Sequence, residues 1–446
     1  MNDFEKVYAI QVILEDLSTH PFCAHGPTLL FRRKIDKNGT TRDFFACSAY
    51  RDRKGCPFFK WADEYKMIND KSSLRKEQLL SELNHDEYFS MLKKIRDAQP
   101  LLRAYCFTCN QFFIKPSKDH TQHNVKYNIS TNELNHPMSL LMPLSNNKKE
   151  AQYLFTQQSV KDITDIAFKL GYCNFLCIGT PLINEYIINK NDKAYSSLLL
   201  DIDTRFHSFY GPSEFIWYNS FNHHFFHPED KTVFEDFLKI DGGTKTCVFM
   251  DPPFGGRLEP LSQTLKIMSE TWLTLNGQEK SEGIKIPVFL IMPYFMESLI
   301  KANMPEMNMS DYKVSYINHS KFNDKKSKQG SIVRFFTNIE LSKVILPSTD
   351  YKFCKLCDYW VSKENSHCKK CNSCTSKDGR TYVHCNICNK CVKPTWTHCE
   401  LCSKCCLPDH KCDNNDQSIR TEHKNTKRAK NVTRQKIPNK FSKKQK

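Results

Sequence analysis

Residues 247–254 read Cys-Val-Phe-Met-Asp-Pro-Pro-Phe, an apolar run that ends in an acid, two prolines and an aromatic residue. Such a run predicts a buried strand that stops where Pro252 and Pro253 remove the backbone donors of the ladder. In open α/β sheets, ligands bind beyond the carboxyl ends of the strands. Asp251 and Phe254 therefore predict a site for a flat group that carries an amino nitrogen. The alternative is a strand followed by an ordinary proline-rich turn.

Two earlier apolar segments also end in residues that suit a bound cofactor. Gly179 and Thr180 follow the first segment, where a turn of small residues lets the backbone approach a ligand closely. Asp201 and Asp203 end the second, where an acid can accept hydrogen bonds from ribose hydroxyls. Each acid taken alone is equally consistent with a loop cap or a solvated charge. Because these strand ends precede Asp251 in order, we expect at least one of the acids to bind a cofactor.

Most of the 21 cysteines occur in C-x-x-C pairs that are accompanied by histidines. The N-terminal residues lack the pattern of a signal peptide, and no apolar stretch is long enough for a membrane span. We therefore expect an intracellular, reducing environment and zinc ligands rather than disulfides. Cys173, Cys177 and Cys247 lie outside the ligand sets and are expected to act as small apolar residues in or beside core strands.

Two sets of four ligands lie near the N-terminus, and each set can complete one tetrahedral zinc site. Basic and aromatic residues around the first set favour contact with single-stranded nucleic acid, although some of the aromatic residues must fill a small core. The second set has only two residues between its histidines, which is fewer than usual. The first set is Cys23, His25, Cys47 and Cys56, and the second is Cys106, Cys109, His120 and His123.

A C-terminal region repeats the motif His-Cys-x-x-Cys-x-x-Cys three times. One partition places the last Cys of each set seven residues after its His, so that neighbouring sets overlap along the chain. Metal bonds would then replace much of an apolar core. The overlapping sets are Cys354, Cys357, His367 and Cys374; Cys368, Cys371, His384 and Cys391; and Cys385, Cys388, His398 and Cys405. A terminal set of Cys399, Cys402, His410 and Cys412 brings the total to about six zinc ions, with Cys406 as a competing ligand.

Strand-like and helical segments alternate between residues 150 and 345, which predicts an α/β domain. Five strand–helix steps followed by two strands with a tight return match the seven-stranded sheet of class I methyltransferases. Periodicity alone also fits other nucleotide-binding α/β folds. The expected strands are 174–179, 197–203, 214–219, 246–251, 287–292, 312–318 and 331–338. The expected helices are 71–96, 159–170 and 258–276, with Ser159 and Asp162 forming a capping box, and residues 124–148 are expected to be a linker.

The formal net charge is +16, which favours a polyanionic partner, although surplus Lys residues can also serve solubility alone. Residues 420–446 contain 11 Lys or Arg and one Glu, so we expect a disordered tail. Such a tail can act as a nuclear or nucleolar address and as a non-specific RNA tether. The basic loop 321–330 is expected either to touch the substrate backbone or gate the pocket, or to be an ordinary solvated loop.

The first ligand set lies in a stretch that resembles a GRF-type zinc finger, CAHGPTLLF followed by RDFFACSAYRDRKGCPFFKWADE. The Gly that usually precedes the Arg of this family is Thr41 here. The central segments FTQQSV, FLCIGTP, LLLDIDTRFHSFYG, WYNSFNHHFF and CVFMDPPFGGRLEPL resemble N6-adenine methyltransferases of the DPPF type. With the C-terminal Cys/His array, nearly the whole chain resembles the zinc finger CCHC domain-containing protein 4 family of ribosomal RNA adenosine N6-methyltransferases.

The resemblance implies an α/β fold, with a class I, Rossmann-like, seven-stranded methyltransferase domain flanked by small zinc-binding domains. It also implies S-adenosylmethionine as methyl donor and a catalytic motif formed by Asp251, Pro252, Pro253 and Phe254. The implied donor-binding residues are Gln157, Gln158, Ser159, Gly179, Thr180, Asp201, Asp203, Asn219, Ser220, Phe221 and Asp251. The expected domains are a GRF-type finger at 15–66, a two-Cys two-His finger at 100–125, the methyltransferase domain at 150–345, the zinc array at 351–413 and the tail at 414–446.

The chemistry explains why the motif needs these residue types. An adenine amino nitrogen is a poor nucleophile, because its lone pair is delocalised into the ring. If the Asp251 carboxylate and the Pro252 carbonyl each accept one N6–H bond, the lone pair can point at the methyl group of the donor. Catalysis then consists mainly of positioning and electrostatics. Phe254 would supply a stacking face for the extruded base.

Three functions therefore remain in competition. The resemblance favours methylation of an adenosine N6 in large-subunit ribosomal RNA, with the fingers recruiting the RNA. Related α/β enzymes methylate protein lysines, and a non-catalytic RNA-binding adaptor is the third reading. We expect a monomer without a membrane partner, located in the nucleus or nucleolus and cytoplasm, with ribosome-assembly or translation proteins as further partners and a role in translation regulation.

Overall fold

The computed structural model describes residues 10–35, 39–50, 52–65, 84–144, 152–190, 192–278, 285–318 and 332–412. The basic loop at 321–330, the tail at 414–446 and the part of the helical segment before residue 84 lie outside these ranges. Among the helices of the described ranges, none has both the length and the apolar character that crossing a membrane requires.

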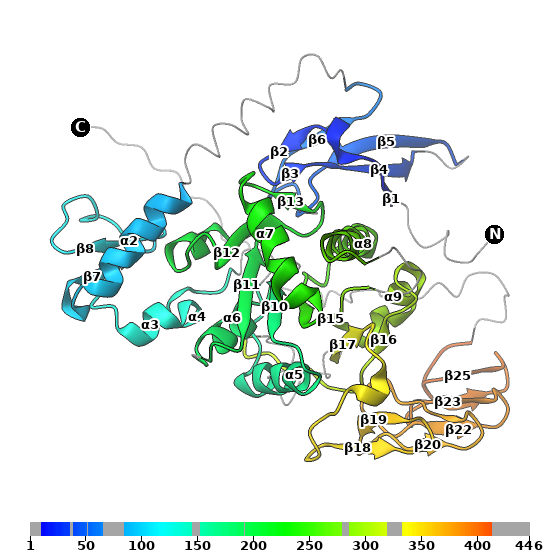
Figure 1. The fold of residues 1–446 in the computed structure, drawn as a ribbon. Coiled ribbons are helices and arrows are strands. Elements are labelled where there is room, and N and C mark those ends of the chain that lie inside the picture. The colour runs from blue at the N-terminus through cyan, green and yellow to red at the C-terminus, as the bar shows by residue number, and fades with distance from the viewer. Residues whose placement is uncertain are drawn as a thin grey trace, which may run out of the picture.

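A mixed eight-stranded sheet forms the centre of the molecule, and the zinc-binding regions surround it (Figure 1). Across the sheet, its strands are β13 (His224–Phe225), β12 (Phe215–Asn219), β11 (Ser196–Asp201), β10 (Asn174–Ile178), β14 (Thr246–Met250), β15 (Val288–Pro293), β17 (Val333–Thr337) and β16 (Asn308–Met309). The five strands from β12 to β15 run parallel, and β13, β17 and β16 pair antiparallel. The sheet thus has one strand more than the expected seven.

Both faces of the parallel strands are buried, as their continuous apolar runs predict. Phe175 and Cys177 of β10 face an apolar cluster with helices α5 (Gln157–Lys169) and α6 (Pro181–Ile188). Leu176 and Ile178 of the same strand face the other cluster. That second cluster contains residues of α7 (Asp230–Lys239), α8 (Leu258–Leu275) and α9 (Glu297–Asn303). The strand ends are therefore held rigidly between two helical layers.

Six of the expected strands and the helices α5 and α8 are confirmed to within two residues at each end. The expected behaviour of the unpaired cysteines is also confirmed for Cys177 and Cys247, which are fully buried in β10 and β14. Cys173 lies half-buried just before β10.

The expected strand at 312–318 is wrong. Tyr312, Val314 and Tyr316 are buried at alternate positions, which gives the segment its strand-like pattern. However, Val314 forms a single bridge with Val333 and Tyr316 forms one with Phe155, so the segment crosses between two partners instead of joining one ladder. The remaining strand of the sheet is the short β16, which lies just before this segment.

Two further expectations are corrected at helix ends and connections. The N-cap of α5 is Thr156, whose side chain accepts a hydrogen bond from the backbone of Ser159, so Ser159 lies in the first turn and does not cap it. The expected linker at 124–148 contains β9 (Val125–Tyr127), α3 (Thr131–Asn135) and α4 (Pro137–Leu140). Although Asn, Ser and Lys dominate the composition of this segment, its apolar residues join the main core. These apolar residues are Ile129, Leu134, Met138, Leu140 and Leu141.

The two N-terminal zinc-binding regions are small sheets packed on the central domain. The first has the order β1 (Ile10–Ile13), β4 (Leu29–Lys34), β5 (Thr41–Ala46) and β6 (Phe59–Trp61), with a hairpin of β2 (Phe22–Cys23) and β3 (Gly26–Pro27). The second has the order β8 (Gln111–Ile114), β7 (Arg103–Cys106) and β9. Helix α2 (His85–Asp97) buries Leu92 and Ile95 in the main core, which confirms the amphipathic pattern in its described part.

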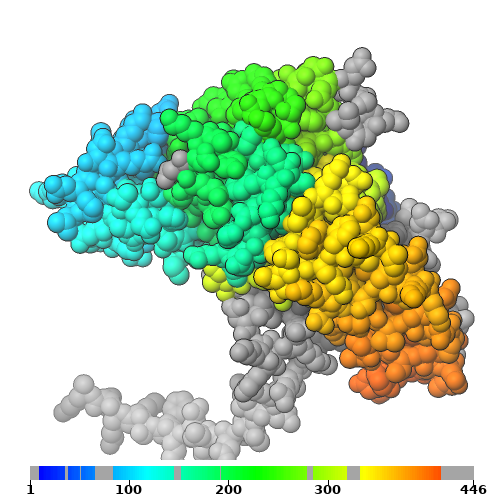
Figure 2. Space-filling model, turned by 60° about the horizontal axis from the view of Figure 1, so that its bottom comes forward, coloured from blue at the N-terminus to red at the C-terminus, as the bar shows by residue number. Residues whose placement is uncertain are grey.

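Four hairpins form the C-terminal array, which packs against the sheet edge that carries β17 (Figure 1). In Figure 2 the array, in yellow to orange, projects from one side of the molecule. They are β18 (Tyr351–Cys354) with β19 (Tyr359–Ser362), β20 (His367–Cys368) with β21 (Ser373–Cys374), β22 (Val383–Cys385) with β23 (Lys390–Val392), and β24 (Thr397–Cys399) with β25 (Lys404–Cys406). In each, the residue after the C-x-x-C pair has a positive φ, a conformation that Asn and Asp tolerate better than most residues. These residues are Asp358, Asn372, Asn389 and Ser403.

A buried ion pair joins this array to the sheet. Arg334 of β17 pairs with Asp311 at 2.9 Å, and the two side chains are only 1% and 6% exposed. The other carboxylate oxygen of Asp311 accepts hydrogen bonds from the Ser362 backbone at 2.7 Å and the Asn365 amide at 3.0 Å. The segment that starts at Asp311 is therefore held by strand β17 on one side and by the zinc array on the other.

Candidate functional site

A cavity lies at the carboxyl ends of β10, β11, β12 and β14, where the sequence predicts a ligand. The structure brings together there ten of the expected site residues, which lie far apart in the chain. They are Gly179, Asp201, Asp203, Asn219, Ser220, Phe221, Asp251, Pro252, Pro253 and Phe254. Further lining residues that the sequence did not point to are Ala49, Tyr50, Leu144, Gln152, Tyr153 and Leu154.

Asp251 follows β14 directly and faces this cavity. The Tyr316 hydroxyl donates to it and lies 3.1 Å from Oδ1 and 3.3 Å from Oδ2. Burial raises the pKa of Asp251 well above its usual value, and the hydrogen bond from Tyr316 lowers that pKa in part. Burial and the neighbouring Asp251 also raise the pKa of Tyr316, so the hydroxyl keeps its proton and acts as a donor.

Aromatic rings gather at the end of the cavity that carries Asp251. Phe254 lies nearly parallel to Tyr153, with ring centroids 6.3 Å apart, and edge-on to Tyr316 at 6.1 Å. Phe254 and Tyr153 are partly exposed, whereas Tyr316 is buried. This end of the cavity therefore offers aromatic faces beside a hydrogen-bond acceptor, which suits a planar base with an amino group.

At the other end of the cavity, the acids differ in how much acceptor capacity they retain. The Asp203 carboxylate pairs with Arg205 at 2.6 Å and also accepts from the Gln152 amide at 3.0 Å. Asp201 Oδ1 accepts from the backbone of Asp203 at 2.9 Å. Burial, reinforced by the charge of Asp203, raises the pKa of Asp201 to about 7. Since Arg205 already holds Asp203, Asp201 is the better placed acceptor for a ligand hydroxyl.

Glycine is needed where β10 turns into α6. Gly179 has a φ of +64°, and a Cβ at this position would lie 3.1 Å from the backbone oxygen of Asp251. The ends of β10 and β14 thus lie so close together that a side chain at position 179 would crowd the backbone of Asp251. The backbone of Gly179 can therefore line the cavity directly. Thr180 follows as the buried N-cap of α6 and does not line the cavity.

The residues at the start of α5 that were expected to contact the methyl donor do not line this cavity. Gln158 and Ser159 line a different, polar cavity beside the C-terminal array. Ser159 Oγ accepts from the backbone of Ser315 at 3.0 Å, and the Gln158 amide donates to Asp162 at 2.8 Å. Gln157 is the first residue of α5 and is also absent from the cavity lining. The segment that does line the cavity is Gln152–Leu154, just before the helix.

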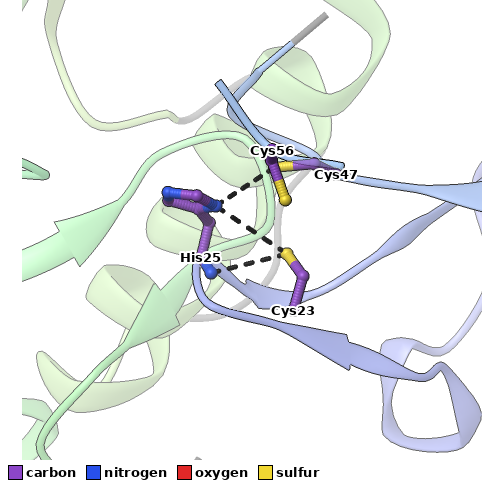
Figure 3. Close-up of side chains that lie close together, drawn as sticks. All are labelled: Cys23, His25, Cys47 and Cys56. Atoms are coloured by element: carbon purple, nitrogen blue, oxygen red, sulfur yellow. Dashed lines mark hydrogen bonds between the residues drawn. The ribbon is translucent and has the colours of Figure 1, made fainter. Parts of the chain in front are cut away.

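Five Cys/His clusters have the chemistry and spacing of tetrahedral zinc sites. Within each, the ligand atoms all lie within 4.8 Å of one another, and membership matches the expected first set, second set and three overlapping sets without exception. Figure 3 shows the first, where Cys23, His25 and Cys47 converge with Cys56. His25 Nδ1 lies 3.9 Å from the Cys23 sulfur and 3.4 Å from the Cys47 sulfur.

The terminal ligands of the array also converge. Cys412 Sγ lies 3.3 Å from Cys399 Sγ and 2.7 Å from His410 Nε2, and that nitrogen lies 3.5 Å from Cys402 Sγ. Cys406 Sγ is 4.0 Å from Cys402 Sγ and so remains near the same centre. These distances favour the expected fourth set of ligands. They also show that Cys406 is close enough to be the competing ligand that the sequence indicates.

The basic side chains of the first finger are largely engaged within it. Arg32 pairs with Asp43 at 2.8 Å, and Arg42 pairs with Asp63 at 2.8 Å. The Arg42 guanidinium also lies 4.0 Å from the ring centroid of Trp61. The finger surface is therefore a network of cations, acids and rings and carries less free positive charge than its composition indicates.

Comparison with known proteins identifies the class of enzyme. Residues 146–341 match the family model for probable N6-adenine methyltransferases, and residues 21–65 match the GRF zinc finger. The central domain is thus that of an N6-adenine methyltransferase, a class that implies S-adenosylmethionine as methyl donor.

Relatives that match most of the chain identify the family more specifically. The chain is 41% identical to rRNA N(6)-adenosine-methyltransferase ZCCHC4 of Xenopus laevis over 376 residues, which is 81% of this chain and 76% of that protein. It is 41% identical to the protein of the same name from Homo sapiens over 360 residues, which is 78% of this chain and 69% of that protein. The chain belongs to the ZCCHC4 family of rRNA N(6)-adenosine-methyltransferases.

Proposed function

We propose that this protein transfers a methyl group from S-adenosylmethionine to the N6 atom of an adenosine in large-subunit ribosomal RNA. The observation that carries the proposal is the position of Asp251, which faces one cavity with the acidic end of β11 and the residues that follow β12. Family membership supports the substrate class.

The residues of the cavity fit the methyl donor. Asp201 has acceptor capacity for ribose hydroxyls, and Gly179 leaves room for a ligand against the backbone. Asn219, Ser220 and Phe221 would hold the adenine of the methyl donor. Asp203 lines the same cavity, and its ion pair with Arg205 would fix its position beside the donor. When bound, the donor supplies an electrophilic methyl group on a sulfonium.

The catalytic end of the cavity would orient the accepting nitrogen. In our proposal, the Asp251 carboxylate and the Pro252 carbonyl each accept one N6–H bond, and this favours a lone pair that projects out of the ring plane. Phe254 and Tyr153 provide faces on which an extruded base can stack. Acceptors that the fold holds in place before the reaction favour this geometry without further reorganisation.

Several finer assignments belong to the same proposal. The strands from β12 to β16 would carry the class I, Rossmann-like arrangement, with β13 as an addition at its edge. Six zinc ions would occupy the Cys/His clusters, and the fingers would recruit the RNA. We further propose a monomer of the nucleus or nucleolus and cytoplasm that meets ribosome-assembly or translation proteins, as its basic composition favours.

A labelling experiment tests the substrate. The purified protein is incubated with methyl-labelled S-adenosylmethionine and either deproteinised ribosomal RNA or total protein, and the RNA is digested to nucleosides for mass spectrometry. We expect N6-methyladenosine in large-subunit RNA. Label found only in protein lysines would contradict the proposal and favour the related lysine methyltransferases.

The contact between Tyr316 and Asp251 predicts a change in the pH dependence of the reaction. The hydrogen bond from Tyr316 lowers the pKa of Asp251, so Tyr316→Phe raises that pKa further. Because the proposed role needs the carboxylate, activity is lost as the pH falls through this pKa. The acid limb of kcat/KM should therefore move to higher pH by about one pH unit, which is the size expected for one hydrogen bond to a charged group.

Tyr312→Phe is the matched control for this experiment. Tyr312 lies in the same segment, and its hydroxyl donates to the carboxylate of Asp162 at 2.9 Å. Loss of that hydroxyl should leave the acid limb in place. An unchanged acid limb in Tyr316→Phe would show that the hydroxyl does not tune Asp251.

A further inference from the structure

One wall of the cavity comes from the first zinc finger. Ala49 and Tyr50 line it together with Asn219 and Phe221 of the central domain. Both finger residues lie in the loop that follows Cys47, a residue of the first ligand cluster. The sequence predicts a role in RNA contact for this finger and gives no indication that it reaches the cavity.

A single buried side chain connects the finger loop to the cavity wall. Asn219, which is 1% exposed, donates its amide hydrogens to the backbone oxygen of His25 at 2.7 Å and to Ser48 Oγ at 2.8 Å. Its carbonyl oxygen accepts from the backbone of Phe221 at 3.0 Å. The same side chain therefore fixes the turn that follows β12 and the finger residue next to Ala49.

The rest of this interface is close-packed, so the finger is held in place. Asn222 donates to the backbone oxygens of His25 at 3.2 Å and Pro27 at 2.8 Å. A Cβ on Gly26 would lie 2.4 Å from the ring of His224, so only glycine permits this approach. In Figure 1 the finger, drawn in blue, lies beside β13.

Tyr50 is also tied to the metal cluster. Its ring contacts that of His25 with centroids 4.7 Å apart, and its backbone N–H donates to the Cys47 sulfur at 3.4 Å. The conformation of the loop at 48–50 thus depends on the geometry of the ligand residues themselves. A bound zinc ion would hold this loop in the position where it lines the cavity.

We propose that the GRF finger completes the methyl-donor pocket, with Ala49 and Tyr50 forming the wall against the adenosine part of S-adenosylmethionine. This inference rests on the function proposed above, because it takes the residues after β12 as the donor's adenine site. The finger then has a task in donor binding that is separate from any contact with RNA. Donor affinity depends on the finger even when no RNA is present.

Calorimetric titration of the full-length protein with S-adenosylhomocysteine, without RNA, tests this proposal. Tyr50→Ala removes the aromatic wall, and we expect a dissociation constant about tenfold higher. Ala49→Met projects a larger side chain into the cavity and leaves the contact between Tyr50 and His25 intact, so it provides a second test if Tyr50→Ala disturbs the cluster. We expect at least the same loss of affinity from it.

Phe59→Ala is the matched control, because Phe59 belongs to the same finger, stacks on Phe44 at 5.0 Å and lies outside the cavity lining. Its donor affinity should match that of the unmodified protein, and metal analysis should give equal zinc for all variants. Asp201→Ala reports on the proposed function itself, and it should also weaken binding.

The outcomes separate the two proposals. If the unmodified protein and Asp201→Ala bind the analogue equally well, or the unmodified protein does not bind it, the assignment of the cavity fails and this inference fails with it. If Asp201→Ala loses affinity but Tyr50→Ala and Ala49→Met do not, only the role of the finger is overturned. If a separate titration of the same variants with ribosomal RNA shows loss of RNA affinity alone in the Tyr50 and Ala49 variants, this loop belongs to the RNA site instead.

Discussion

Replacing Asp251 with alanine should reduce methyl transfer by about 10²–10³-fold or more, the range measured when one preorganised polar group is removed from an active site. The carboxylate is the acidic acceptor at the aromatic end of the cavity, where Phe254 and Tyr316 flank it. Its loss leaves the Pro252 carbonyl alone to orient the amino nitrogen. Single-turnover rates with saturating RNA and donor measure this effect on the chemical step.

The zinc content and the thermal unfolding of Asp251→Ala should match those of the unmodified protein. Burial raises the pKa of Asp251, so its removal takes a costly charge out of the folded state, and this gain offsets the loss of the acceptor for the buried Tyr316 hydroxyl. Asp236→Ala, on the exposed side of α7, serves as the control for loss of an acid and should keep full activity. Turnover close to normal in Asp251→Ala would contradict the proposed role of the motif.

Asp311→Ala should lower the free energy of unfolding by about 3–5 kcal/mol, the cost of leaving one partner of a buried ion pair without the other. Arg334 is 1% exposed and would keep its charge in the interior. The substitution also removes the acceptor for Ser362 and Asn365 of the zinc array. Urea unfolding with zinc present measures the change, and activity should fall because the same segment carries Tyr316.

Two comparisons isolate the ion pair. Glu340→Ala breaks an exposed pair with Lys343, at 3.0 Å, and should change the unfolding free energy by about 0–1 kcal/mol. Combining Asp311→Leu with Arg334→Met removes both charges and should recover most of the stability. If Asp311→Ala unfolds like the Glu340 variant, the pair does not hold the array to the sheet.

The strands and the metal clusters could be predicted, because their signals are local. The run that ends at Asp251 and the acids after β11 fix which strand ends carry polar groups, and parallel strands bring such ends to one edge. Zinc ligands can be recognised in a sequence by residue type and spacing, so the predicted members of five ligand sets match the clusters in the structure. Even His120 and His123, with their short spacing, join one cluster.

The contacts that complete the site could not be predicted, because they join segments distant in the chain. Tyr316 lies 65 residues from Asp251, and its alternation with Tyr312 and Val314 indicated only a strand. Gln157–Ser159 were expected at the cavity, yet the N-cap at Thr156 directs the preceding residues there instead. The sequence around Ala49 and Tyr50 does not indicate that they line a cavity. Their position depends on the hydrogen bonds by which Asn219 of the central domain holds the first zinc finger.

That shared wall has a consequence for chemical inhibition. Small molecules that compete for a donor site shared by many enzymes discriminate poorly, because they contact groups that those enzymes have in common. Here two of the lining residues, Ala49 and Tyr50, come from the zinc finger, and the same two line a neighbouring groove that reaches Phe31 and Arg257. A compound extended from the cavity into that groove would gain its selectivity from atoms that a methyltransferase without this finger does not possess.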